Sequence, residues 1–405
     1  MFTKEDLQEF LENLLGMIRW LIVAGITGVL VGLVGVLFGK GMTFVNGCRA
    51  AHPWIIWLLP VGGVAIIGLY HLFHVYNPRG TNLVLEAIHA KEEVPLYMAP
   101  LIIVSTLITH LVGGSAGREG AALQLGGSIG EQLGRWFRFD DKDRGLMVMC
   151  GMSAAFSALF GTPLAAAVFP MEVASVGIMH YAALVPCVCA SIVASRLALY
   201  FGMQPEAFPV LEVPEFTGTT AGAAVLLGIL CAIISIVFCV MLHQVGAQFK
   251  KFSNPYVKAA VGGVIILAIT LLLGTQDYSS AGIPLIERAL EGEVRPEAFL
   301  LKMILTAITL GCGFKVERSC RPSAWAPPSV PCSDRCWGCL RRCTVRQAWR
   351  RCSAASPTAR SPRCLSALKC LASRVCSITP SPCPSAICCP AITACITIRR
   401  SCILR

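Results

Sequence analysis

A glycine-rich segment from Gly113 to Gly127 carries the residues best suited to bind an anion. It lies between two apolar stretches and holds Arg118 and Glu119 side by side. Glycines let the backbone approach a ligand and adopt positive φ angles, which exposes N–H groups. A helix that begins near Gly120 would add free N–H groups and the positive end of its dipole, which together bind anions. The segment therefore predicts an anion site at a helix start.

Glu119 could make this site respond to protons. A carboxylate beside exposed N–H groups competes with a small anion for them, and it gives them up when it is protonated. Proton and anion occupancy would then be linked. The alternative is a satisfied Arg118–Glu119 pair that only closes a turn. Ionisable side chains at membrane depth cost about 2.5–3.5 kcal/mol to insert and are usually functional, which favours the linked site.

The elements that position this segment are predicted to be membrane helices. The chain is 55% hydrophobic and 14% charged, whereas soluble domains carry about 25% charged residues. Three uncharged runs, Leu21–Phe38, Trp54–Tyr70 and Thr217–Met241, are each near the roughly 20 residues that a spanning helix needs. We therefore expect an all-α, multi-spanning integral membrane protein in contact with the lipid bilayer.

The apolar region contains an internal repeat. The segment Gly80–Ile88 returns as Ala281–Ala289 at an offset of 201 residues, and Glu86 is then matched by Glu287. Both copies run into an apolar helix that ends in glycines, and we expect the offset to stay constant over about thirty residues. Two repeats of broken helices that meet near the bilayer midplane are typical of transporters.

The repeat and the charge pattern divide the chain into three predicted regions. Residues 1–20 carry mixed charges and predict an amphipathic helix at the membrane surface. Residues 21–313 are predicted to form the transmembrane domain, with repeat one at about 21–200 and a partial repeat two at about 217–313. Residues 314–405 form a tail rich in Cys, Arg and Pro.

The sequence Gly117-Arg118-Glu119-Gly120 resembles the gating motif of the CLC family, the voltage-gated chloride channel superfamily. Ala121, in place of the usual proline, and Gly161–Val173 are similar to the fluoride/proton antiporter branch. The resemblance covers roughly residues 15–315. It implies an all-α fold of broken helices in an inverted repeat, proton-coupled antiport of a halide, a homodimer, and Glu119 as a proton-linked gate. The anion-path residues that it implies are Gly117, Arg118, Gly120, Gly80, Thr81 and Asn82.

Two departures from the chloride-type pattern favour fluoride over chloride. That pattern has Gly-Ser-Gly-Ile-Pro before the first half-helix, where the serine binds chloride, but this chain has Pro78–Asn82 without a serine. Chloride/proton exchangers carry an inner proton glutamate directly after the position of Glu172, where this chain has Val173. Fluoride export is therefore the predicted function. A chloride/proton exchanger, a passive chloride channel and a non-transporting membrane protein are the alternatives.

The other polar residues of the membrane region predict no further chemistry. His110, on an apolar helix, is expected to be a packed core histidine. No nucleophile–base set or metal cluster occurs there, so we expect no enzyme, no metal, no cofactor and no nucleic-acid partner. The expected partners are a halide anion, fluoride or chloride, together with protons.

The last ninety residues differ in composition from the rest. Residues 316–405 hold 15 Lys and Arg against two Asp and Glu, 14 of the 21 cysteines, and no Phe, Tyr, Met or His. The family pattern requires more membrane helices and a second glycine-rich half-helix there. Read one nucleotide earlier, the codons of Trp325–Pro331 can give Leu-Gly-Ala-Thr-Phe-Gly-Ala, which is similar to family sequence. We therefore interpret the tail as frameshifted and disordered, which leaves the second half truncated.

Two other interpretations of the tail were weighed. A disordered basic tail is compatible with the excess of arginine. A cysteine-rich zinc module could use Cys332, Cys336, Cys339 and Cys343, but their spacing is not a standard one.

Overall fold

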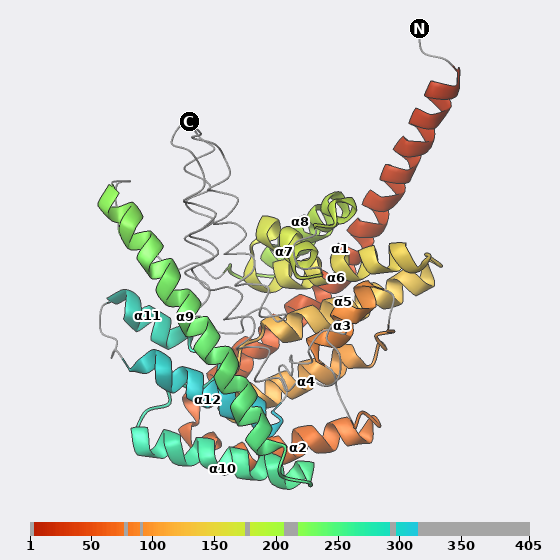
Figure 1. The fold of residues 1–405 in the computed structure, drawn as a ribbon. Helices are drawn as coiled ribbons and strands as arrows, with labels where there is room; N and C mark the ends of the chain where they lie inside the picture. Colours follow the sequence, from red (N-terminus) through yellow and green to blue (C-terminus); the bar gives the residue numbers. More distant parts are fainter. Residues whose placement is uncertain are drawn as a thin grey trace, which may run out of the picture. The chain divides into compact units, whose positions relative to one another are not determined.

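The computed structural model describes residues 4–76, 80–89, 92–174, 179–205, 218–291 and 297–314. All of them lie in one compact unit. Every regular element among these residues is helical, which confirms the predicted all-α fold (Figure 1). The tail, with its predicted frameshift or zinc module, lies outside the described residues, and so does the second half-helix expected after residue 314.

The first eight helices are the following: α1 Lys4–Ala51, α2 Leu59–Leu72, α3 Thr81–Ile88, α4 Met98–Leu111, α5 Glu119–Trp136, α6 Asp141–Phe160, α7 Pro163–Ala174 and α8 Leu184–Tyr200. Short 3-10 turns, η1 (Pro53–Leu58) and η2 (Tyr181–Ala183), precede α2 and α8. Four more helices follow: α9 Gly218–Phe249, α10 Pro255–Leu273, α11 Ile283–Glu291 and α12 Ala298–Cys312.

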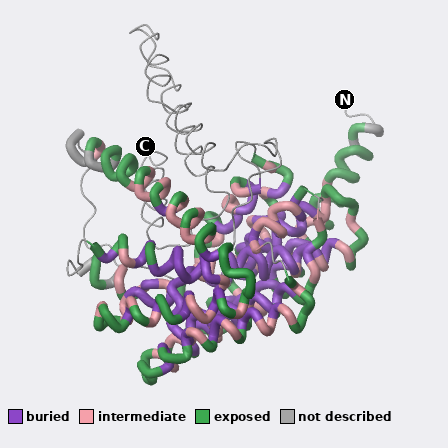
Figure 2. The backbone as a smooth tube through the Cα atoms, turned by 60° about the horizontal axis from the view of Figure 1, so that its bottom comes forward, coloured by how far each residue is buried: buried purple, intermediate pink, exposed green. Residues whose placement is uncertain are grey.

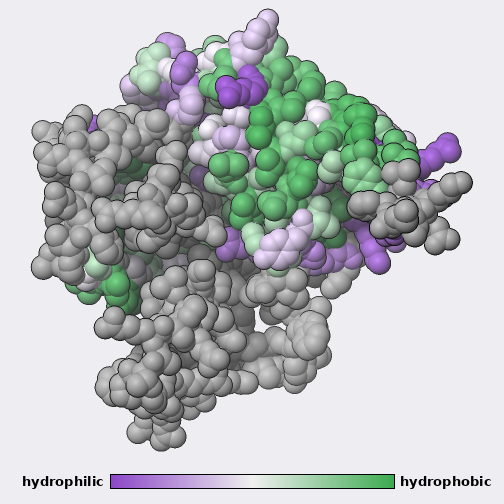
Figure 3. Space-filling view, turned by 90° about the horizontal axis from the view of Figure 1, so that it is seen from above, coloured by the Kyte–Doolittle hydropathy of each residue, from purple (hydrophilic) through white to green (hydrophobic). Residues whose placement is uncertain are grey.

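Long apolar helices and shorter ones both occur along the chain, as expected for a transporter with broken helices. Five helical stretches of the described residues are long and apolar enough to cross a membrane: Gln8–Ala51, Pro53–Leu72, Tyr181–Tyr200, Val225–Phe249 and Pro255–Leu273. At 1.5 Å per residue, α3 and α11 span only about 12–14 Å, less than half of a bilayer core. Figure 3 shows apolar side chains gathered on the exposed face of the described part. The chain is an integral membrane protein with broken helices.

Helix α1 corrects the predicted N-terminal boundary. We expected residues 1–20 to form a separate surface helix, but a single unbroken helix runs from Lys4 to Ala51. No proline interrupts it, so nothing forces a break at residue 20. Trp20 stacks on Phe139 with 5.3 Å between ring centres, and Arg19 lies 4.9 Å from the same ring. These contacts join this part of α1 to the turn between α5 and α6.

The closest packing is between α5 and α6. A Cβ atom added to Gly126 would clash with the carbonyl oxygen of Gly151, and one added to Gly151 would clash with that of Gly126. The two backbones therefore touch, as small residues permit in membrane helix pairs. Helices α1 and α8 pack on α6. Figure 2 shows buried residues gathered along these helices, whereas α9 is largely exposed.

The helix boundaries follow the internal repeat, with one correction to its offset. In α4 and α12, Thr106, Thr109 and Gly113 are matched by Thr306, Thr309 and Gly313, so the offset there is 200 residues. The offset of 201 holds only around α3 and α11. The repeat therefore does not keep a constant offset, because Glu287 precedes Thr306 by 19 residues, whereas Glu86 precedes Thr106 by 20.

Helices α2 and α10 extend the repeat and pack on each other. Val61-Gly62-Gly63-Val64 returns as Val261-Gly262-Gly263-Val264. A Cβ atom on Gly62 would meet Val112, just after α4, and one on Gly262 would meet Cys312 at the end of α12. The two repeats thus make equivalent contacts.

Candidate functional site

The glycine loop, residues Gly113–Arg118, connects α4 to α5 as non-helical backbone. Gly113 has φ +87°, and the N–H of Gly114 donates to the Thr109 carbonyl at 2.8 Å, which ends α4. Residues 113–117 are all buried. Non-helical backbone at membrane depth is tolerated where protein buries it or where it lines a cavity, and this loop meets the first condition.

Helix α5 begins at Glu119, as the sequence predicted to within one residue. Its N-cap residue is Arg118, whose side chain makes no capping hydrogen bond. The first N–H groups of a helix have no acceptor within the helix. They meet the Glu119 carboxylate, which accepts hydrogen bonds from the backbone N–H groups of Arg118 and Glu119. The carboxylate therefore occupies donors that a bound anion would use.

The remaining features of Glu119 and Arg118 suit a mobile carboxylate. Glu119 Oε2 is buried and makes no hydrogen bond to a described residue. The Arg118 guanidinium carbon lies 5.2 Å from the centre of the Phe160 ring, at the end of α6, within the range of a cation–π interaction. Its charge also acts on Glu119. The assignment of Gly117, Arg118, Glu119 and Gly120 to the site stays a prediction.

The predicted loop at Gly80–Asn82 is a helix start instead. Gly80 has φ +62°, and with that turn the chain enters α3 directly at Thr81, which is buried. Helix α3 packs against α5 and α6. A Cβ atom on Gly127 would clash with Val84, so α3 meets α5 about two turns beyond Glu119.

The glycine loop of repeat one is held by α12 of repeat two. The N–H of Ser115 donates to Thr309 Oγ1 at 3.2 Å, and the hydroxyls of Ser115 and Thr306 are 3.0 Å apart. Sequence analysis missed these threonines. Lys302, Thr306 and Thr309 follow each other at four- and three-residue spacing, which places them on one helix face. A polar stripe on an apolar helix was the signal that could have revealed them.

Ser280 joins both repeats at the glycine loop. Its N–H donates to the Gly114 carbonyl at 3.1 Å, its hydroxyl to Asn46 Oδ1 at 3.1 Å, and its carbonyl accepts from Lys302 Nζ. Its φ is +57°, a conformation that costs a non-glycine residue energy and is often found at functional sites. These bonds link α1 and α12 to the glycine loop.

His110 lies in the core, where it was expected. It is fully buried, and its Nδ1 is 2.9 Å from the Thr106 carbonyl. Its Nε2 has no hydrogen-bond partner among the described residues.

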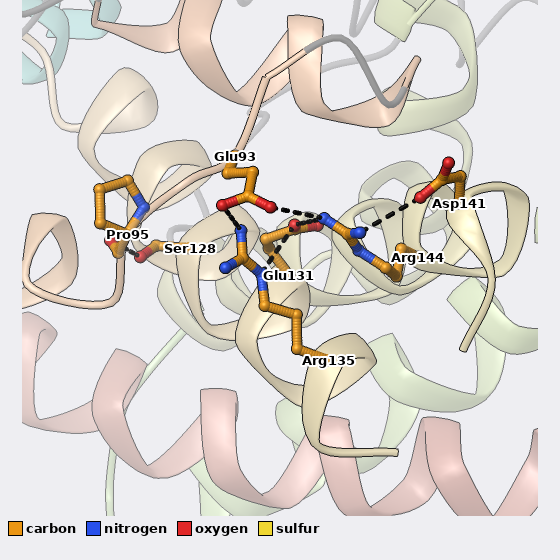
Figure 4. Close-up of polar contacts among 7 residues, drawn as sticks. All are labelled: Glu93, Pro95, Ser128, Glu131, Arg135, Asp141 and Arg144. Carbon is orange, nitrogen blue, oxygen red and sulfur yellow. Dashed lines mark hydrogen bonds and ion pairs between the residues drawn. The ribbon is translucent and has the colours of Figure 1, made fainter. Parts of the chain in front are cut away.

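A charged network fixes the other end of α5, about 18 Å from Glu119 along the helix. The buried Glu131 carboxylate accepts from Arg144 and, at 3.3 Å, from Arg135 (Figure 4). Arg135 also pairs with Glu93 at 2.8 Å, and Arg144 with Asp141 at 3.2 Å. Glu131 raises the pKa of Arg144, which lies in the first turn of α6, outside the apolar spans. The network ties the segment before α4 to α5 and α6.

Comparisons with known proteins agree with this architecture. The family model described as voltage gated chloride channel matches residues 69–316, so the match ends where the composition of the chain changes. The chain is 37% identical over 305 residues to the "Chloride/fluoride channel protein" of Pseudomonas syringae pv. tomato, covering 73% of this chain and 68% of the relative. It is 26% identical over 313 residues to the "H(+)/Cl(-) exchange transporter ClcA" of Salmonella arizonae, covering 71% and 65%.

Two solved structures share the fold. A CLC-type fluoride/proton antiporter has a TM-score of 0.70 and 30% identity, with 78% of each chain covered. A slow cyanobacterial Cl−/H+ antiporter has a TM-score of 0.62 and 20% identity, with 73% of this chain and 74% of that chain covered. The second likeness supports the fold alone.

Proposed function

Because the chain belongs to the voltage-gated chloride channel family of anion-transport proteins, we propose that its membrane domain exchanges fluoride for protons, with Glu119 as the proton-linked gate. The observation that carries this proposal is the Glu119 carboxylate, which bonds the backbone N–H groups at the start of α5 and keeps a buried oxygen that has no partner among the described residues. A carboxylate so placed can be displaced by a small anion or neutralised by a proton.

The cycle follows from competition for these N–H groups. While Glu119 is ionised, its carboxylate fills the donors at the helix start and blocks the path. When it takes up a proton it loses its charge, its hydrogen bonds to the N–H groups weaken, and a fluoride ion can replace it there. When the proton leaves on the other side, the carboxylate returns and expels the anion. Each proton taken up therefore admits an anion, which couples the two movements.

Three features support fluoride as the anion. The segment before α3 lacks a serine, and Val173 stands where chloride/proton exchangers have a glutamate. The Pseudomonas syringae relative and the antiporter with the TM-score of 0.70 are both named for fluoride. Fluoride is small and strongly hydrated, so its site must replace water with close, hard donors such as backbone N–H groups. Chloride/proton exchange is the second candidate, because the Salmonella relative is named for it.

The selectivity test uses a frame-restored chain, in which the codons after residue 314 are returned to the reading frame that the family pattern implies. Purified protein is reconstituted in liposomes loaded with fluoride or with chloride, and efflux is followed with ion-selective electrodes. We expect fluoride efflux to exceed chloride efflux at equal concentration. Equal or faster chloride efflux would contradict fluoride selectivity and favour the second candidate.

The gate is tested in the same liposomes by Glu119→Gln. The amide cannot ionise, so proton movement should stop following anion movement, whereas the anion path stays open. A pH electrode measures proton uptake during anion efflux. Glu172→Gln, which alters an exposed carboxylate, serves as the matched control and should keep the wild-type coupling. Coupled proton uptake in the Glu119→Gln variant would show that the gate lies elsewhere.

The assembly is proposed on the same basis. We expect a homodimer embedded in the lipid of a bacterial plasma membrane. Mass measurement of the frame-restored chain in lipid nanodiscs tests the dimer.

A further inference from the structure

Two basic side chains near the glycine loop have buried nitrogen atoms and no carboxylate partner among the described residues. Lys302, on α12, is 7% exposed, and its Nζ donates to the Tyr278 carbonyl at 3.0 Å and to that of Ser280. Arg49 lies in the last turn of α1, and its Nε and Nη1 are buried and have no hydrogen-bond partner in the described part of the chain. Among the described residues, neither side chain forms an ion pair.

Ser280 brings these two side chains to one place. Asn46, which accepts from the Ser280 hydroxyl, lies three residues before Arg49, so the two share a face of α1. Lys302 bonds the carbonyl of the same serine. Lys302 and Arg49 act on each other electrostatically, and Lys302 also acts on Glu119. The pair therefore sits where α1, α12 and the glycine loop meet.

The charges in this region do not balance. Arg118 and Lys302 act on the Glu119 carboxylate, Arg49 acts on Lys302, and among the described residues no other carboxylate takes part in these interactions. His110 lies among them with its Nε2 unpartnered among the described residues. An ammonium has three N–H donors, of which two are used in Lys302. Buried charge requires a countercharge and partners for its donors, and Glu119 already bonds the backbone.

We propose that Arg49 and Lys302 form a halide-binding site of their own, the junction site, at the meeting point of the two repeats. This inference rests on the proposed function and extends it. A halide supplies the single negative charge and the hard acceptor that the unpaired N–H groups of Arg49 and the third N–H of Lys302 lack. The halide occupies the junction site while the Glu119 carboxylate fills the donors at the start of α5. Once Glu119 is protonated, the halide moves to those donors.

Halide binding to the purified full-length chain, measured by calorimetry with sodium fluoride and sodium chloride, tests the junction site. We expect saturable heat for the unaltered chain and at least tenfold weaker binding in Lys302→Met and in Arg49→Gln. Lys302→Arg keeps the charge and the donors and should keep binding within about threefold. The matched control is Lys258→Met, because Lys258 is also 7% exposed but lies on α10. It should bind as the unaltered chain does.

Glu119→Gln separates this site from the gate. Without the carboxylate, the region gains net positive charge, so halide should bind more tightly to Glu119→Gln than to the unaltered chain. The loss of halide binding that Lys302→Met causes should persist when Lys302→Met is combined with Glu119→Gln. Absence of halide heat in the unaltered chain, or unchanged affinity in Arg49→Gln, overturns the proposal. If Lys302→Met does not fold, Arg49→Gln decides alone. Because binding needs no flux, halide binding in a chain that fails the liposome assays would retain the junction site and reject the proposed transport.

Discussion

Helices α4 and α12 hold equivalent positions in the two repeats, yet only the threonines of α12 have the partners that the symmetry predicts. Thr306 and Thr309 hold Ser115 of the glycine loop. Their counterparts are Thr106 and Thr109, and the Thr106 hydroxyl oxygen is buried without a hydrogen-bond partner among the described residues. By symmetry, its partner would belong to the loop that follows α12. The described part of repeat one therefore includes its glycine loop, whereas the described part of repeat two ends just after α12.

Helices α1 and α9, which begin the two repeats, also differ, because the helix of repeat one is more deeply buried. Half of the apolar stretch of α1 is buried, against 6% of that of α9. Helix α1 is covered by α4, α6 and α8, and the equivalents of α6 and α8 in repeat two would follow residue 314. Charge also distinguishes the repeats, because Lys302 in α12 is matched by Ile102 in α4. The two repeats therefore share the arrangement of their helices, but they differ in burial and in the charged residues that they carry.

The largest expected effect concerns the part of repeat two that follows α12. The chain as printed should give no anion flux above protein-free liposomes, whereas the frame-restored chain should transport. An anion at the midplane needs donors on all sides, and one half-helix cannot offset its lost hydration. Residues 316–405 carry 15 Lys and Arg, each costing about 2.5–3.5 kcal/mol at the centre of a spanning helix.

Flux from the printed chain at the rate of the frame-restored chain would show that repeat two is complete as written. Sequencing the nucleotides around codon 315 is the control, because it reveals directly whether the reading frame changes there.

The sequence predicted the part of the site that depends on neighbours along the chain. The glycine run, the apolar helices around it and the carboxylate at a helix start all follow from local pattern, and the structure places α5 at Glu119. The bonds among Asn46, Ser280 and Lys302 could not be predicted, because they join residues up to 234 positions apart. Such contacts depend on how the repeats pack, which no local pattern reports.

The structure places two predicted boundaries differently. Residues 4–20 were separated from the first span because their charges differ, but a helix continues through a change of polarity when no residue breaks it. The family resemblance implied that Gly80–Asn82 lines the anion path before the first half-helix, whereas the structure has Gly80 at a turn and Thr81 already in α3. The composition of the chain showed where its environment changes, but it did not show where the backbone changes its conformation.

A second prediction tests how repeat one is fixed at the far end of α5. Arg144→Met should lower the free energy of unfolding by about 3–5 kcal/mol, because it leaves Glu131 buried beside a weaker set of partners. Thermal unfolding in detergent measures the loss. Asp141→Asn is the control, because Asp141 is 75% exposed and exposed ion pairs contribute little. A loss in the control as large as in Arg144→Met would mean that the surface pair and not the buried carboxylate matters.

The smallest expected effect bears most directly on the asymmetry between α4 and α12. Thr306→Val removes the hydroxyl that meets Ser115 and leaves that buried side chain with one partner fewer, which should cost about 0.5–1.5 kcal/mol in unfolding free energy. Thr106→Val makes the same chemical change at the matching position, where the hydroxyl oxygen has no described partner. Replacing an unsatisfied buried hydroxyl by a methyl group of the same shape is close to neutral or stabilising. In the chain with the unaltered reading frame, thermal unfolding should therefore show a loss of stability for Thr306→Val and little or no loss for Thr106→Val.

In the frame-restored chain the loop after α12 can reach Thr106, and the two valine variants should then become equally destabilising. Comparing the loss of unfolding free energy in the two valine variants is more specific than measuring either loss alone, because differences in detergent or helix propensity affect both positions alike. Equal losses already in the printed chain would mean that Thr106 has its partner there, and that repeat two is as complete as repeat one.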